Sequence, residues 1–368
     1  MTTLPSLEML ETPVAVVDLD RMDANLRKSA EYCRGHGLAW RPHVKTHKTP
    51  ALASAQLRAG ASGVTVATLR EAEVMARAAD DILLAYPPIG APKLERLADL
   101  LRSGVRLTVG LDSRHALQGL AGAARDAQAT AGVLIELDLG MGRVGVGTPE
   151  EAVALARHAA EIDALEYRGI MFYPGHLRAV ENEHDPALRA LSDRLRPFLE
   201  ALKDAGLEAR VVSGGSTPTF WYSHRIEGLT EVRPGTNIFN DRTTAAIGAC
   251  GWDECAYSIL AMVVSTAVRG QAVVDAGSKA LAKEELRGAG SGFGALLDRP
   301  EIGVRAVSEE HGILDLSGTD WRPQVGERVR IVPNHVCVSV NLQERLLGVR
   351  GGEVVETWEV AGRGRGRG

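Results

Sequence analysis

The sequence is poor in the features that mark several classes of protein. Aromatic residues make up only 4% of its 368 positions, and no apolar run reaches the roughly 18 residues that a membrane helix needs. The four cysteines form no CxxC pair, and a chain of this length needs no disulfide framework. Residues 1–20 lack a basic segment followed by an apolar run and a cleavage site. These absences predict a cytoplasmic protein with free thiols and no membrane partner.

The chain also lacks a strong excess of charge of either sign. Its formal net charge of −5 argues against nucleic acid as the main partner. The terminal GRGRGRG is basic, but it is short and has no aromatic residues, so we expect a disordered tail over 361–368 rather than an RNA-binding segment. Glycine is abundant instead, with 40 residues, which is typical of a large α/β enzyme with many glycine-containing loops.

Short β-branched runs alternate with longer Ala/Leu/Arg stretches from residue 14 to about 245. The first run is VAVVDLD, and further runs lie near 39–44, 63–67, 82–86, 105–109, 133–138, 168–173, 210–213 and 229–233. Amphipathic stretches such as PEEAVALARHAAEI separate most of them. This alternation predicts a (β/α)8 TIM barrel over 14–245. An open doubly wound sheet is the alternative, but no GxGxxG follows the first run.

The pattern changes past residue 245, where strand-like runs are divided by Gly, Pro and polar turns. Examples are YSILAMVVSTAV, QAVVDAG, GERVRIVP and HVCVSVNL. Helical signals are nearly absent from this part. We therefore predict an α/β chain in which a C-terminal β domain over 246–360 follows the barrel, with residues 1–13 packed on that domain.

The stretch RPHVKTHK, residues 41–48, concentrates positive charge at the end of the second run. On an extended strand, Arg41, His43, Lys45 and His47 would share one face, with Lys48 on the other. Cations and desolvation at a barrel mouth lower the pKa of an ammonium group and free its amine. The pattern therefore predicts a nucleophilic Lys45. An exposed basic strand end is the alternative interpretation.

Two glycine-rich loops follow the last two barrel runs. They are SGGSTPT at 213–219 and RPGTN at 233–237, and TIM barrels often bind phosphate at these positions. Glycine N–H groups and hydroxyls suit a phosphate dianion, although both loops are also explained as tight turns. A lysine amine together with a phosphate site indicates pyridoxal phosphate (PLP), held on Lys45 as a Schiff base.

The segment PNHVCVSVNL places His335 and Cys337 two residues apart, on the same side of a predicted strand. Imidazole and thiolate are good zinc ligands. Two protein ligands leave coordination positions for water and substrate, as a catalytic metal requires. A histidine and a small cysteine packed in the core of the β domain are the alternative.

Nine motifs in order resemble those of the D-serine dehydratase/D-threonine aldolase family. They are ETPVAVVDLDRMDANL, RPHVKTHK, LDLGMGRVGV, GIMFYPGH, SGGSTPT, RPGTNIFND, VDAGSKAL, EEHG and PNHVC, and they span nearly the whole chain. Members of this family are fold-type III PLP enzymes related to alanine racemase. The resemblance implies a PLP-dependent lyase in which a PLP-binding TIM barrel is followed by a C-terminal β domain.

The resemblance also implies residue roles. Lys45 carries the cofactor with His43 beside it, Arg143 approaches the phenolic oxygen, and Tyr173 contacts the pyridine ring. The expected phosphate-binding residues are Gly214, Gly215, Ser216, Gly235 and Thr236. His335 and Cys337 are the expected catalytic metal ligands, with Glu310 and His311 close to the metal. Asn237 stands where the family usually has tyrosine.

The second metal ligand separates two activities within the family. D-threonine aldolases usually show His-x-Asp and take manganese, whereas D-serine and D-threo-3-hydroxyaspartate dehydratases show His-x-Cys and take zinc. His335-x-Cys337 therefore favours zinc, with manganese or another divalent cation as the alternative. We predict dehydration of D-serine, D-threonine or 3-hydroxyaspartate to a 2-oxo acid and ammonia.

Other functions remain as alternatives to dehydration. Aldol cleavage to glycine and an aldehyde is the first. A racemase would use Lys45 without a metal, and a non-catalytic PLP-binding barrel would not need the β domain. By analogy with related two-domain enzymes we expect a homodimer that acts on a small D-amino acid.

Overall fold

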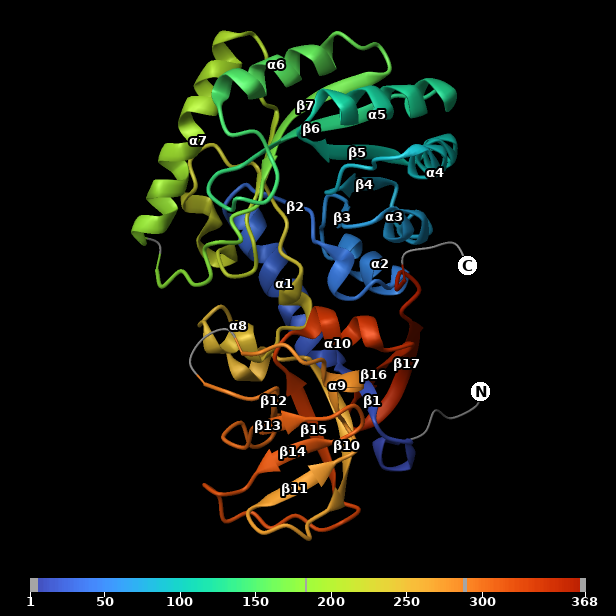
Figure 1. The fold of residues 1–368 in the computed structure, drawn as a ribbon, viewed down its shortest axis with the longest axis vertical. Helices are drawn as coiled ribbons and strands as arrows, with labels where there is room; N and C mark the ends of the chain where they lie inside the picture. The colour runs from blue at the N-terminus through green and yellow to red at the C-terminus, as the bar shows by residue number, and fades with distance from the viewer. Residues whose placement is uncertain (1–5, 183, 287–289, 365–368) are drawn as a thin grey trace. The chain divides into compact units, whose positions relative to one another are not determined.

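The computed structural model describes residues 6–182, 184–286 and 290–364, which form two compact units (Figure 1). The barrel unit comprises the described residues between 29 and 235, together with 362–364. The sheet unit comprises 6–28 and the described residues between 236 and 361. Among these residues, no helix combines the length and the apolar character needed to cross a membrane.

The barrel unit contains a sheet of eight parallel strands in the order β2-β9-β8-β7-β6-β5-β4-β3. The strands are β2 (Ala39–Trp40), β3 (Val64–Val66), β4 (Asp81–Leu84), β5 (Arg106–Leu111), β6 (Ala131–Leu137), β7 (Leu165–Phe172), β8 (Val211–Gly214) and β9 (Glu231–Val232). The ends of this order also meet, because a parallel bridge pairs His43, just after β2, with Thr65 of β3. The predicted (β/α)8 barrel is confirmed.

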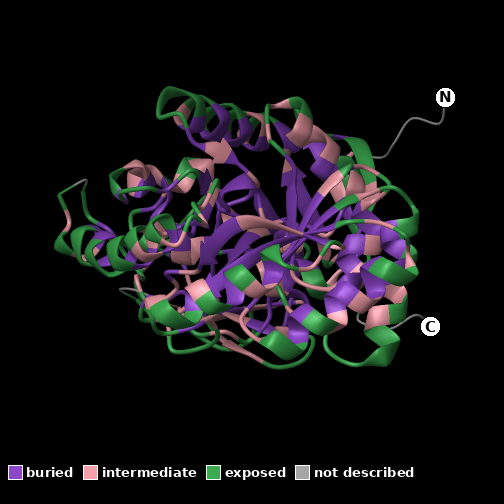
Figure 2. Ribbon diagram, turned by 90° about the horizontal axis from the view of Figure 1, so that it is seen from above, coloured by how far each residue is buried: buried purple, intermediate pink, exposed green. Residues whose placement is uncertain are grey.

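Helices follow six of the eight barrel strands. They are α2 (Pro50–Arg58), α3 (Leu69–Met75), α4 (Ala91–Arg102), α5 (Arg114–Asp126), α6 (Pro149–Ala160) and α7 (Pro186–Asp204). A Ser, Thr or Asp side chain accepts a backbone N–H at the start of α3, α5, α6 and α7, which satisfies groups that a helix end leaves without partners. The strands are buried and the helices carry the exposed outer face (Figure 2).

The sheet unit contains a nine-stranded sheet whose main order is β13-β14-β11-β10-β1-β16-β17, with β15 pairing β10 and β12. Its strands are β1 (Val14–Asp18), β10 (Tyr257–Ser265), β11 (Gln271–Val274), β12 (Gly294–Leu296), β13 (Val304–Val307), β14 (Gly312–Asp315), β15 (Arg328–Pro333), β16 (Arg345–Arg350) and β17 (Glu353–Glu359). The pairs are antiparallel except for β1 with β16. The predicted C-terminal β domain is therefore present.

The placement of β1 differs from the prediction. VAVVDLD lies inside the predicted barrel range 14–245, but β1 pairs with β10 and β16 of the sheet unit. Val16 packs there with Leu260, Val349 and Val354. These contacts join residues far apart in the sequence, so they cannot be predicted from a short apolar run. The division between the units accordingly falls after residues 28 and 235, whereas the predicted ranges were 14–245 and 246–360. Helix α1 (Leu19–Gly35) runs across the first of these divisions.

Short helices interrupt the sheet unit. They are η1 (Leu7–Met9), η4 (Thr236–Ile238), α8 (Arg242–Ala246), η5 (Trp252–Glu254), α9 (Ser278–Leu281) and α10 (Val336–Leu342). The last one corrects a prediction, since VCVSVNL was expected to be a strand. Its buried residues Val336, Ser339 and Val340 follow helical spacing, and the Asp241 carboxylate accepts the Val336 N–H at 3.0 Å. This tertiary contact outweighs the β propensity of the three valines.

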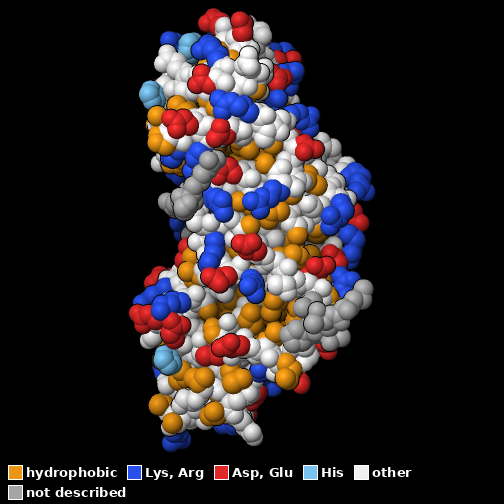
Figure 3. All heavy atoms as spheres, turned by 90° about the vertical axis from the view of Figure 1, so that its right-hand side faces the viewer, with side chains coloured by type: hydrophobic (Ala, Val, Ile, Leu, Met, Phe, Trp, Pro, Cys, Tyr) orange, Lys and Arg blue, Asp and Glu red, His pale blue; other side chains and the backbone are white. Residues whose placement is uncertain are grey.

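The two ends of the described chain lie against neighbouring residues of their own units. Leu7 and Leu10 pack on the sheet-unit cluster around Val16. Of the predicted tail 361–368, residues 365–368 lie outside the described part, and the Gly362 N–H donates to the Lys48 carbonyl at 2.9 Å. Acidic and basic side chains are interspersed over one face of the chain (Figure 3).

Candidate active site

Lys45 lies in a turn rather than on a strand. Strand β2 ends at Trp40, and η2 (Val44–Thr46) follows it. The Lys45 backbone N–H donates to His43 Nδ1 at 3.5 Å, which closes the turn. The prediction that 41–48 is extended, with alternate side chains on one face, is therefore wrong. The bend places Lys45 at the carboxyl end of β2, where barrel enzymes gather their catalytic groups.

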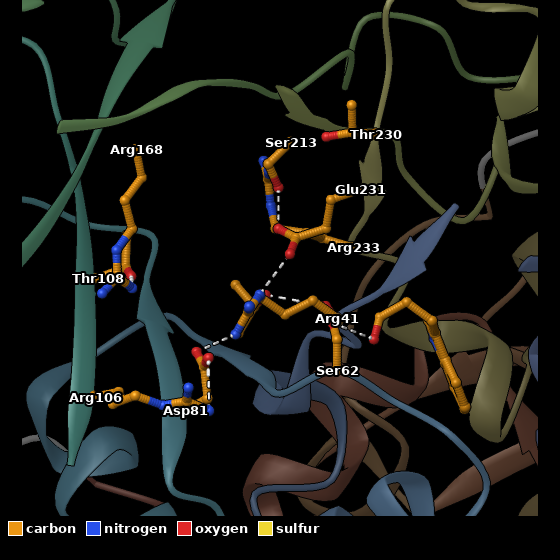
Figure 4. A network of polar contacts seen from close by, with 12 residues as sticks. Arg41, Ser62, Asp81, Arg106, Thr108, Arg168, Ser213, Thr230, Glu231 and Arg233 are labelled. Atoms are coloured by element: carbon orange, nitrogen blue, oxygen red, sulfur yellow. Dashed lines mark hydrogen bonds and ion pairs between the residues drawn. The ribbon is translucent and has the colours of Figure 1, made fainter. Parts of the chain in front are cut away.

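Two of the residues predicted to support Lys45 have structural roles instead. Arg41 pairs with Asp81 at 2.6 Å and with Glu231 at 2.7 Å, which ties β2 to β4 and β9 (Figure 4). His47 is fully buried; its Nδ1 accepts the Thr49 N–H, and its Nε2 lies 3.1 Å from Gln56 Oε1. Burial lowers the pKa of His47 to about 4, so this ring stays neutral in the fold at neutral pH.

A buried polar network connects β7, β8 and β9 of the barrel (Figure 4). Ser213 Oγ donates to Glu231 at 2.6 Å, and Arg233 contacts Ser213 Oγ and donates to the Phe172 carbonyl at 2.9 Å. Burial lowers the pKa of Arg233, and the carboxylates of Glu231 and Glu136 oppose that shift. Arg233 was not among the predicted site residues, although it opens the RPGTN motif.

Arg143 reaches Tyr173 because of the loop after β6. The Asp138 carboxylate accepts the N–H groups of Gly140 at 2.9 Å and Gly142 at 3.0 Å, and these bonds lower the pKa of Asp138. Both glycines have positive φ, a conformation that other residues rarely adopt. The tight loop brings Arg143 Cζ to 5.0 Å from the Tyr173 ring centroid.

Lys45 and Arg143 converge on the same ring, since Lys45 Nζ lies 5.8 Å from the Tyr173 centroid. The local potential is positive. Burial, followed by the charges of Lys45, Arg233 and Arg143, lowers the pKa of His43 well below its ordinary value. A neutral imidazole beside three cations suits an anionic ligand, such as a phosphate or a phenolate.

The two predicted phosphate loops lie side by side. They follow β8 and β9, which pair in parallel through Gly214 and Val232, and β9 also pairs with β2. Gly215 has a φ of +81°, and a Cβ at Gly214 would overlap the Phe172 ring. A Cβ at Gly235 would lie 2.7 Å from the His43 carbonyl oxygen. Both loops thus need glycine for close backbone approach, which fits a phosphate cradle next to the Lys45 turn.

His335 and Cys337 lie at the start of α10 in the sheet unit. His335 is the N-cap residue, and Cys337 lies in the first turn. His335 Nδ1 is 2.5 Å from Glu284 Oε2, and Thr236 Oγ1 is 3.9 Å from Cys337 Sγ. Burial opposes charge on His335, but Cys337, Asp241 and Glu284 together raise its pKa to about 9.

The side chains of His335 and Cys337 lie close enough to hydrogen-bond with each other. Imidazole and thiolate are donors that suit a soft divalent metal, so the pair fits such an ion. In the described part of the chain, no group of three or more His, Cys, Asp or Glu side chains is arranged to hold a metal ion. A metal held by His335 and Cys337 would keep its other coordination positions for water or substrate. Although α10 is a helix and not the predicted strand, the side chains of His335 and Cys337 are close enough to interact.

Two predicted neighbours of the metal have other surroundings. Glu310 is mostly exposed and pairs with Lys279 at 2.7 Å, and the His311 carbonyl accepts the Ser308 N–H. The acidic residues beside His335 are instead Glu284 and Asp241. Asp241 had a sequence signal as a helix N-cap followed by Thr244, but Glu284 lies in a charged stretch, LAKEEL, without a distinguishing pattern.

Comparison with known proteins gives the family. The alanine racemase N-terminal domain matches residues 17–243, and the serine dehydratase domain matches 256–349. The chain belongs to the D-serine dehydratase/D-threonine aldolase family of fold-type III PLP-dependent enzymes. It is a PLP-dependent lyase.

Similar proteins of both activities cover nearly the whole chain. The D-threo-3-hydroxyaspartate dehydratase of Delftia sp. is 35% identical, over 96% of this chain and 98% of that protein. The D-threonine aldolase of Arthrobacter sp. is 31% identical, over 98% of this chain and 95% of that protein. Sequence similarity alone therefore does not choose between elimination and aldol cleavage.

Solved structures similar to this chain also include both aldolases and dehydratases. The D-threonine aldolase from Filomicrobium marinum has a TM-score of 0.91 at 33% identity and covers 99% of this chain and 98% of its own. A D-threo-3-hydroxyaspartate dehydratase variant in a metal-free form has a TM-score of 0.87 at 34% identity and covers 99% of this chain and all of its own. The alanine racemase from Bacillus anthracis, at 17% identity and a TM-score of 0.69, shares the fold.

Proposed function

We propose that this enzyme dehydrates a D-β-hydroxy amino acid to a 2-oxo acid and ammonia. The substrate classes are 3-hydroxyaspartate, D-threonine and D-serine. The observation that carries the proposal is the Cys337 thiol beside His335, because a thiolate favours zinc over manganese. The 35% identical relative from Delftia is a dehydratase, which supports the same choice.

In this proposal the predicted cofactor residues hold PLP and Lys45 moves the α-proton. The loops at Gly214–Gly215–Ser216 and Gly235–Thr236 bind the phosphate, and the Tyr173 ring and Arg143 orient the pyridine ring and its phenolic oxygen. Bound PLP supplies an electron sink for the charge that develops at Cα. Lys45 holds the cofactor and then removes the α-proton as the general base.

The sheet unit holds the metal that assists the leaving group. His335 and Cys337 bind zinc, which supplies Lewis acidity to the β-hydroxyl so that it leaves more readily. Gly235 and Thr236 are consecutive residues. Gly235 packs on the His43 backbone within the barrel unit, and Thr236 lies near Cys337 within the sheet unit.

Aldol cleavage to glycine and an aldehyde is the second candidate function. It is favoured by the TM-score of 0.91 to a D-threonine aldolase. The zinc-supplemented holoenzyme should be incubated with D-threonine and its products identified by NMR. Dehydration yields 2-oxobutyrate and ammonia, whereas glycine and acetaldehyde would overturn the proposal. The variant Lys45→Ala and a sample treated with chelator serve as controls.

We further propose that the enzyme is a homodimer that works in the cytoplasm. The described cysteines are all free thiols, which is typical of a reducing compartment. Dimerisation rests on analogy with related two-domain enzymes. Light scattering of the purified holoenzyme should give about twice the chain mass of 39.3 kDa, and a single-chain mass would contradict it.

A further inference from the structure

We propose that Glu284 is a positioning residue for the metal ligand His335. This inference rests on the proposed function, because it assumes that His335 binds zinc. Glu284 Oε2 lies 2.5 Å from His335 Nδ1. An Nδ1–H that donates to this carboxylate fixes the tautomer and leaves Nε2 with its lone pair for the metal.

The backbone of Glu284 is fixed by the residue that precedes His335. The Asn334 side chain is buried and donates to the Glu284 carbonyl at 3.0 Å and to the Gly292 carbonyl at 2.6 Å. Arg242 in turn donates to Asn334 Oδ1 at 3.3 Å. Two contacts therefore link Glu284 to His335. One joins their side chains, and the other runs from the Glu284 carbonyl to Asn334, the residue before His335.

The chain reaches this position through a strained residue. Ala282 has a φ of +70°, a region that residues with a Cβ rarely adopt. It is the C-cap residue of α9 and precedes the irregular segment that carries Glu284. Strain of this kind is retained where the surrounding structure requires it, and the segment after Ala282 carries the Glu284 that contacts His335.

The second carboxylate near His335 has a different role. Asp241 Oδ2 accepts the Val336 N–H at 3.0 Å, and Asp241 Oδ1 accepts the Thr244 N–H at 2.8 Å. It therefore holds the start of α10 in place, whereas Glu284 contacts the imidazole itself. The sequence provides a matched control next to Glu284, because Glu285 carries the same charge and is exposed.

The test is the zinc affinity of the full-length PLP holoenzyme after its metal has been removed. Zinc is titrated in competition with a chromophoric chelator for the wild type, E284Q, E284A and E285Q. We expect E284A to bind zinc roughly 10–100-fold more weakly than the wild type, with E284Q between the two because its amide oxygen still accepts from Nδ1. E285Q should bind like the wild type.

A second measurement separates positioning from a general structural effect. At saturating zinc, E284Q should recover most of the wild-type kcat, because Glu284 is not proposed to touch the substrate. Wild-type affinity in E284A would overturn the inference, and so would a loss in E285Q equal to that in E284A. If C337S loses zinc while E284A does not, the metal site stands and the role of Glu284 falls. If the wild type itself binds no zinc, both fall.

Discussion

The backbone of Gly235 packs directly against the carbonyl of His43, so that a Cβ at position 235 would lie 2.7 Å from the carbonyl oxygen. This contact joins the loop after β9 to the turn that carries Lys45. No residue other than glycine fits there without moving one of the two segments.

The first prediction follows from this contact. Gly235→Ala should push the loop away from the Lys45 turn at a cost of about 1–3 kcal/mol, and PLP affinity should fall tenfold or more. PLP binding is measured from absorbance during titration of the apoenzyme. The control is Gly122→Ala in α5, where a new Cβ meets nothing within 4 Å. Equal affinity in both variants would remove position 235 from the phosphate site.

Replacement of Lys45 tests the catalytic base. Lys45→Ala should lower kcat by roughly 10²–10⁴-fold or more, since a positioned base contributes about that factor. Borohydride reduction should attach PLP covalently to the wild type and to Lys93→Ala, which changes an exposed lysine on α4. It should not do so in Lys45→Ala. Covalent labelling of that variant would place the cofactor on another lysine.

Replacing Cys337, the softer of the two proposed metal ligands, tests whether its thiolate causes a preference for zinc. Cys337→Asp should weaken zinc binding relative to manganese, because a carboxylate is a harder donor than a thiolate. Metal content after dialysis against both ions measures the preference. Cys337→Ala should lose both bound metal and dehydratase activity. Full activity of that variant in the presence of a chelator would exclude a metal-dependent reaction.

The buried network at Arg41 should matter for stability. Glu231 is 4% exposed and pairs with Arg41 at 2.7 Å. Glu231→Gln removes one of the two carboxylates that pair with the buried Arg41 and leaves Asp81 as the other, so it should cost about 1–3 kcal/mol of unfolding free energy. Urea denaturation measures the loss. Asp99→Asn breaks a largely exposed pair with Arg102 and should cost less than about 1 kcal/mol.

His47 should make stability depend on pH. Burial lowers its pKa in the fold to about 4, below the unfolded value near 6.5, so the unfolded state binds more protons between these values. Its contribution is complete above pH 6.5 and is lost as the pH falls through 4. Between pH 8 and 5.5 the loss is about 1 kcal/mol. Urea denaturation should show that increment in the wild type and not in His47→Gln; an unchanged pH dependence in the variant would contradict this prediction.

The sequence by itself determined the barrel and the identity of the candidate site residues. Strand–helix alternation is a local pattern, and the eight strands of the barrel and the six helices that follow them can be predicted from it without knowledge of long-range contacts. Gly214, Gly215 and Gly235 were identifiable because the carboxyl ends of parallel strands meet at one edge. The spacing of His335 and Cys337 suggested a metal site or a pair of core residues, and the resemblance to the family favoured the metal site.

Tertiary structure decided what local patterns leave open. The apolar run 14–18 suits either sheet, and only its pairing with β10 and β16 placed it. The segment 336–342 has β-branched residues, yet it forms a helix whose first N–H donates to the Asp241 carboxylate. The positions of Arg41 and Glu284 depend on partners 40 to 190 residues away. Hydrogen bonds and ion pairs across such separations outweigh local propensity, because an unpaired buried polar group costs more than a poor conformational preference.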